Sequence, residues 1–109
     1  MSNLTLSRNE ILINLIRERF EEKGYAQVSG NNKFGYLGGN QNHFIVSREN
    51  GSDTKIPIDK IISAIEAVRK ENAVYNQGPS ALRKYGITHI NSPIWAILHL
   101  LTINEIIAD

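Results

Sequence analysis

The 109-residue chain contains no cysteine, and this absence limits the chemistry available to it. Without cysteine there is no disulfide, iron–sulfur cluster, cysteine-bound zinc or thiol nucleophile. An excess of one charge is also missing, because twelve lysine and arginine residues against eleven aspartate and glutamate residues leave a net charge of +1. A protein that binds nucleic acid or membrane over its whole surface is therefore not expected, although this balance is still compatible with a local basic patch.

Long hydrophobic runs are missing as well. The longest, Ile94 to Leu98, is interrupted by His99 and falls short of the ~20 apolar residues that a membrane-spanning helix needs. The first ten residues lack the basic start and apolar stretch of a secretion signal. These features predict a cytoplasmic protein that is not inserted in a membrane. The length of the chain predicts one domain over residues 1–109.

The first regular element predicted is a helix from Arg8 to Lys23. Ser7 and Glu10 have the spacing of a capping box, and Gly24 is suited to end the helix in a left-handed conformation. Between them, apolar residues recur at the spacing that places them on one face of a helix. These residues are Ile11, Leu12, Leu15, Ile16 and Phe20.

Between Tyr25 and Ile56 the pattern changes to short runs separated by clusters of glycine and asparagine. This pattern is typical of an antiparallel meander of three or four strands. Asn50-Gly51 is the strongest turn signal, since both residues tolerate positive φ, and Pro57 is expected to end the last strand or lie at a sheet edge. The predicted strands are Tyr25 to Ser29, Lys33 to Leu37, His43 to Arg48 and Thr54 to Ile56.

Three helices are predicted after the strands. The first is capped by Asp59 and runs from Lys60 to about Glu71, and the second is a short helix from Pro79 to Tyr85. The third is predicted to begin at Pro93 and to extend as far as Ile107. The fold class is therefore α+β, in the order α-β-β-β(-β)-α-α-α, with the helices on one face of a small antiparallel sheet.

The last predicted helix is apolar on most of its sides, so most of its sides must be covered. It is expected to form either the central helix of the core or one half of a subunit interface. Trp95, Leu98 and Leu101 are the candidates for such an interface. Ile45 is a further candidate, because it lies at the centre of a strand that is apolar on both faces. A second copy of the chain could cover that strand.

The leading hypothesis for function is a small non-catalytic interaction or regulatory module, homodimeric, that binds a protein partner. It follows from the apolar last helix and from the lack of a convincing catalytic pattern. No cofactor is predicted.

An alternative is a nucleic-acid-binding module, because aromatic residues on a sheet stack on bases while lysine and arginine neutralise phosphate. The segment around Gly86 resembles the turn of a helix-turn-helix, but Pro93 would then lie inside the recognition helix, which it disfavours. The candidates for nucleic-acid binding are Lys33, Tyr36, His43, Arg48, Arg83 and Lys84.

A metal-dependent nuclease, or another enzyme acting on a small ligand, is a less favoured alternative. Asp53 and Lys55 have the spacing found where a carboxylate holds Mg²⁺ and a lysine steadies the attacking water. His43 is a further candidate for this site, with Tyr36 and Trp95 as pocket lining. The partner carboxylate expected on a preceding strand is missing, and the three histidines lack ligand spacing, so no metal site is predicted.

Overall fold

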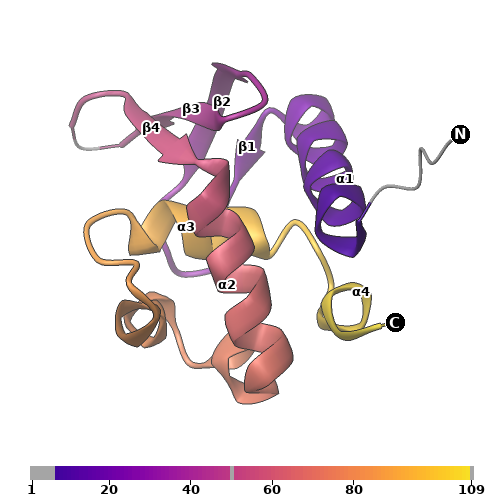
Figure 1. Cartoon of the computed structure of the whole chain (residues 1–109). Helices are drawn as coiled ribbons and strands as arrows, with labels where there is room; N and C mark the ends of the chain where they lie inside the picture. The colour runs from indigo at the N-terminus through magenta and orange to yellow at the C-terminus, as the bar shows by residue number, and fades with distance from the viewer. Residues whose placement is uncertain (1–6, 50, 109) are drawn as a thin grey trace, which may run out of the picture.

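A computed structural model of the chain describes residues 7–49 and 51–108. It confirms the α+β class and the antiparallel meander, which has the strand order β1-β2-β3-β4 (Figure 1). The elements are α1 (Arg8–Lys23), β1 (Tyr25–Ala26), β2 (Phe34–Gly39), β3 (His43–Arg48), β4 (Thr54–Pro57), α2 (Ile58–Lys70), the 3₁₀ helices η1 (Asn72–Asn76) and η2 (Pro79–Tyr85), α3 (Asn91–Leu98) and α4 (Ile103–Ile107).

Helix α1 begins and ends where its sequence signals predicted. The Ser7 hydroxyl accepts the N–H of Glu10, and the Glu10 carboxylate accepts the N–H of Ser7. Gly24 ends the helix with a φ of 83°. The buried face is rotated slightly from the predicted one, because Ile13 is buried while Ile11 is 43% exposed.

The sheet packs one face against α1. Phe44 on β3 pairs with Ile56 on β4, and both side chains are fully buried. The ring of Phe20, from α1, lies 5.7 Å from the Phe44 ring and 4.9 Å from the Tyr36 ring, measured between centroids. Pro57 ends the edge strand β4, as predicted, because it has no N–H to give to a ladder.

The turn before β4 is described only in part. Asn50, the first residue of the predicted Asn50-Gly51 turn, lies outside the described residues, while Gly51 has a φ of 138°.

Helix α2 begins one residue earlier than Asp59, so the prediction that Asp59 caps it is wrong. Pro57 is the N-cap residue, and no side chain accepts a hydrogen bond from the first turn. Pro57 already has the extended backbone that an N-cap requires, so the chain enters the helix directly from β4. Asp59 lies in the first turn, where its negative charge suits the helix dipole.

The predicted single helix from Pro93 to Ile107 is wrong, because the chain breaks into α3 and α4. The N–H groups of Leu100 and Leu101 bond to carbonyls only three residues back, which tightens the chain after α3. Thr102 and Glu105 then form a second capping box that starts α4. The tightened turn after α3 and the capping box that starts α4 therefore outweigh the continuous apolar pattern of the sequence.

Helices α2 and α3 lie beneath the sheet in Figure 1, with α1 alongside and α4 at the far end of α3. The buried side chains of all these elements form one continuous apolar cluster. None of the helices in the described parts of the chain is both long and apolar enough to cross a membrane.

We predict that Gly39→Ala destabilises the β2–β3 hairpin. A Cβ atom at Gly39 would lie 2.5 Å from the His43 carbonyl oxygen and 3.0 Å from the Phe44 Cα, both of which are backbone atoms. The expected loss is about 1–3 kcal/mol in the free energy of unfolding, measured by urea denaturation. Gly35→Ala is the control, because its Cβ would meet the Ser47 hydroxyl, which can rotate away. Equal losses in the two variants would contradict the prediction.

Candidate anion-binding pocket

The four candidates for a subunit interface differ in how far they are buried in the structure. Trp95, Leu98 and Leu101 are 4%, 0% and 1% exposed, and they belong to the core cluster of a single chain. The apolar segment that contains them is therefore covered without a second copy. Ile45, by contrast, is only half-buried.

Ile45 lies on the face of the sheet that points away from the helices. It follows the core-facing Phe44, so the alternation of a strand directs its side chain outward. Lys55, the residue of β4 that is paired with Ile45, is exposed. Leu37 follows the inward-facing Tyr36 at an irregularity in β2 and is 51% exposed. This outer sheet face therefore carries apolar side chains without a covering helix.

Tyr36, the aromatic residue predicted to stack on nucleic-acid bases, faces the core instead. The Tyr36 ring lies 6.2 Å from the Phe44 ring, and its hydroxyl donates to the Glu21 carboxylate at 3.1 Å. Burial, and then the bond to Glu21, raise the pKa of Tyr36. Lys33 and Arg48 lie against other rings of the sheet, Tyr25 at 4.7 Å and Phe34 at 5.7 Å.

The remaining basic candidates lie in a different part of the molecule. Arg83 and Lys84 belong to η2, the orange coil at the lower left of Figure 1, while the sheet lies at the top. Lys84 is paired with Glu71 at 3.0 Å, and the hydrogen bond from Lys84 lowers the pKa of Glu71. The six candidates for nucleic-acid binding therefore do not share one surface.

The residues of the proposed nuclease site are not gathered around a metal position. Asp53 is exposed in the turn before β4, whereas His43 and Lys55 lie on the sheet, opposite Pro57 and Ile45 respectively. Within residues 7–49 and 51–108, no group of three histidine, aspartate or glutamate side chains could hold a metal ion.

A different group of residues, which the sequence analysis did not single out, surrounds α4. This helix has five residues, of which only Ile106 is buried, so it is too short to be stable alone. Arg8 donates from Nη2 to the Glu105 carbonyl at 2.6 Å, and Arg69 donates from Nε to the Ile106 carbonyl at 2.9 Å. Arg19 donates from both Nη atoms to the Glu105 carboxylate, each at 2.7 Å. We call Arg8, Arg19 and Arg69 the arginine clamp.

Glu105 is the strongest electrostatic contact of the arginine clamp. Its carboxylate accepts two hydrogen bonds from Arg19 and one from the Thr102 N–H at 2.8 Å. The Arg19 bonds, and then the Thr102 bond, lower the pKa of Glu105 to about 2. Arg19 also donates to the Leu100 carbonyl at 2.7 Å, so one side chain holds both the start of α4 and the segment before it.

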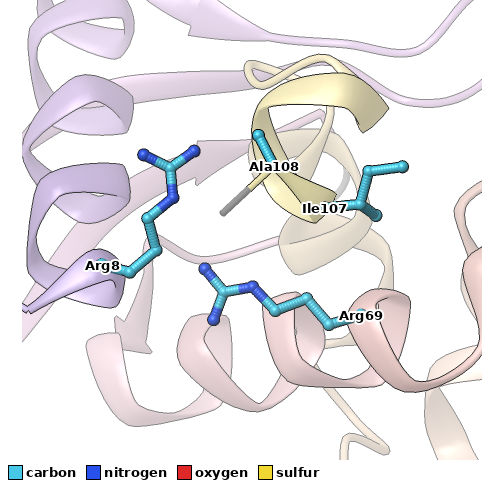
Figure 2. Close-up of a pocket in the computed structure, with 4 residues that line it drawn as sticks. All are labelled: Arg8, Arg69, Ile107 and Ala108. Carbon is cyan, nitrogen blue, oxygen red and sulfur yellow. The ribbon is translucent and has the colours of Figure 1, made fainter.

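Two members of the arginine clamp also line an open pocket of about 510 Å³, together with Ile107 and Ala108. Figure 2 shows Arg8 reaching from α1 and Arg69 from α2 toward the end of α4, which carries the two apolar residues. Ile107 is 40% exposed. The pocket thus combines two guanidinium groups with an apolar wall.

Each of these two arginines has one shielded nitrogen atom without an acceptor. Arg8 Nε and Arg69 Nη2 are shielded from water and have no hydrogen-bond partner within the described residues. A buried donor left in this state costs about 1–3 kcal/mol. Of the two salt bridges in the described part of the chain, one involves Arg19 and the other Lys84, so neither Arg8 nor Arg69 is paired with a carboxylate there. Two positive charges with free donors favour an anion as the ligand.

Arg69 has a neutral partner on its other side. Arg69 Nη1 donates to the Asn9 side-chain oxygen at 2.5 Å, and the Asn9 amide in turn donates to Glu66 at 3.4 Å. The Glu105 carboxylate is bound by Arg19 rather than by Arg8 or Arg69.

Comparison of the chain with protein-family models, curated proteins and solved structures found no match. The assignment of the pocket therefore depends on its geometry and charge.

We predict that the bond between Arg19 and Glu105 makes the stability of the chain depend on pH. The pKa of Glu105 is about 2 in the folded chain against an ordinary value of 4.5, so its stabilising effect is complete above pH 4.5 and is lost as the pH falls toward 2. Glu105→Gln should lower the free energy of unfolding by about 1–2 kcal/mol at pH 7, a modest value because the pair is about one-third exposed.

Urea denaturation between pH 7 and pH 2.5 measures this effect. The difference between the wild-type chain and Glu105→Gln should shrink toward zero as the pH falls. Glu71→Gln is the control, because it breaks the salt bridge with Lys84 at an exposed site and should change stability less. A difference for Glu105→Gln that stays constant with pH would show that the carboxylate charge does not matter.

Proposed function

We propose that the chain is a small non-catalytic binding module that recognises an anionic group between Arg8 and Arg69. The observation that carries this proposal is the pair of guanidinium side chains that line one pocket, neither of them in a salt bridge in the described part of the chain. An oxyanion between them would accept hydrogen bonds from both. Such charge-assisted bonds contribute about 1.5–3 kcal/mol each.

The charge of the pocket supports binding at physiological pH. A guanidinium group stays protonated throughout the physiological range, so Arg8 and Arg69 remain donors whatever the local environment. Two like charges at one pocket repel each other, and an anion between them removes that repulsion. The pocket therefore gains electrostatic energy from an anionic occupant.

The composition of the pocket supports binding without catalysis. Its lining consists of two arginines, one isoleucine and one alanine. None of these side chains is a nucleophile or exchanges a proton near neutral pH. The pocket can hold and orient a ligand but offers no group to react with it.

Binding an anion uses the same side chains that hold α4. Arg8 Nη2 and Arg69 Nε bond to the helix, whereas Arg8 Nε and Arg69 Nη2 have no partner in the described part of the chain and are shielded from solvent. The guanidinium groups must therefore rotate before these two nitrogens can reach a ligand.

We predict that Arg69→Gln and Arg8→Lys weaken anion binding at least tenfold. Each removes a free N–H donor, and Arg8→Lys does so while keeping the positive charge. The test is a titration of ¹⁵N-labelled protein with acetate and with phosphate, following the backbone amides of α4 and the Arg8 Nε–H signal. Lys70→Gln is the control, because Lys70 is an exposed cation beside Arg69 that does not line this pocket. Unchanged affinity in both arginine variants would overturn the proposal.

A second candidate function is self-association through the outer sheet face. The observation that favours it is a pair of apolar side chains on neighbouring strands, the 51% exposed Leu37 of β2 and the half-buried Ile45 of β3. Sheets commonly bury such faces by packing on another sheet about 10 Å away. A second copy would place the same apolar residues opposite one another, so a homodimer with two-fold symmetry would cover both.

If this face forms a homodimer, Leu37→Lys should yield a monomer at concentrations where the wild-type chain is a dimer. A lysine at this position introduces a charge into the apolar contact and would repel its copy across a two-fold axis. Size-exclusion chromatography with light scattering measures the mass directly. Ile11→Lys is the control, because Ile11 is 43% exposed but lies on α1. A wild-type chain that is monomeric at high concentration would exclude this function.

A further inference from the structure

We infer that the anion bound between Arg8 and Arg69 is a single carboxylate carried on a short apolar group. This inference depends on the proposed function and names the class of its ligand. The structure supplies three arguments for it: the two guanidinium groups at one pocket, the helix end beside them and the apolar wall of the pocket.

The two guanidinium groups match the two oxygens of a carboxylate. Both line one pocket, and neither is in a salt bridge in the described part of the chain. A carboxylate has two acceptor oxygens on one carbon and can therefore accept from both arginines at once.

The end of α4 disfavours a doubly charged ligand. The carbonyl oxygens of Glu105 and Ile106, at the C-terminal end of this helix, are held beside the same two arginines. The carbonyl end of a helix carries partial negative charge, which opposes an anion more strongly as the charge of that anion rises. One negative charge therefore fits the two guanidinium groups and the helix end better than two.

The apolar wall provides a surface for the rest of the ligand. Ile107 and Ala108 form the side of the pocket contributed by α4, and 40% of Ile107 is exposed to water. Each methylene that is fully removed from water should strengthen binding about fourfold. The volume of about 510 Å³ is within the range of small-molecule sites, so an acid with a short aliphatic chain fits it.

The experiment compares acetate, butyrate and hexanoate with phosphate by the NMR titration described above. Affinity should rise at least tenfold from acetate to hexanoate, and phosphate should bind more weakly than hexanoate. Hexanamide, which has the same chain without the charge, should not bind measurably. A peptide with a C-terminal leucine is titrated alongside the same peptide with an amidated end, to distinguish a free acid from the end of a protein partner.

Variants of the protein separate the contribution of the ligand's aliphatic chain from that of its carboxylate. Ile107→Ser should remove most of the gain from acetate to hexanoate and leave acetate binding unchanged. Ile11→Ser, a similarly exposed isoleucine on α1, is the matched control and should leave the whole series unchanged.

The results distinguish the inference from the proposed function. If acetate and phosphate bind in an arginine-dependent manner but affinity does not rise with chain length, or phosphate binds more tightly than hexanoate, the inference is wrong and the proposed function holds. If none of the anions binds in a manner that depends on Arg8 and Arg69, the proposed function itself fails.

Discussion

The position of the last helix depends on guanidinium groups as well as on apolar packing. Only Ile106 of α4 is buried, and three arginines from two other helices hold its backbone and its Glu105 side chain. Arginine suits this task because its planar fork places several donors in fixed directions, so one side chain can satisfy carbonyl oxygens that a helix leaves free at its end. Each guanidinium group has more N–H donors than the oxygens of α4 accept. The proposed anion pocket follows from how α4 is attached, because two of the arginines that hold the helix also line the pocket at its end.

Apolar burial and hydrogen bonds to charged groups therefore contribute differently in different parts of the molecule. The sheet, α1, α2 and α3 share an apolar core in which Phe20, Phe44 and Trp95 are almost fully buried. Helix α4 joins that core through Ile106, but most of its other contacts are polar. Hydrogen bonds to charged groups depend on pH and on salt, whereas apolar burial does not depend directly on either. The pocket consequently lies in the part of the structure whose stability is most sensitive to ionic conditions.

The sequence predicted those elements whose signals are local. Helix α1 carries a capping box at one end and glycine at the other, and the meander is marked by its turns, so both were found close to their observed limits. The break between α3 and α4 was missed although Thr102 and Glu105 have capping-box spacing, because the apolar pattern around them seemed continuous. The pocket could not be predicted at all. Arg8 and Arg69 are far apart in the sequence, and each resembles an ordinary exposed residue of an amphipathic helix until the fold brings them together.

The two edges of the sheet limit how these molecules can assemble. On one side the border strand β1 has only two residues, and on the other β4 ends in Pro57, which has no N–H to offer a neighbouring strand. Neither border is a good template for adding further chains side by side. If copies associate through the outer face of the sheet, as proposed, two molecules would cover each other and leave nothing for a third. The result would be a closed pair rather than a growing fibre.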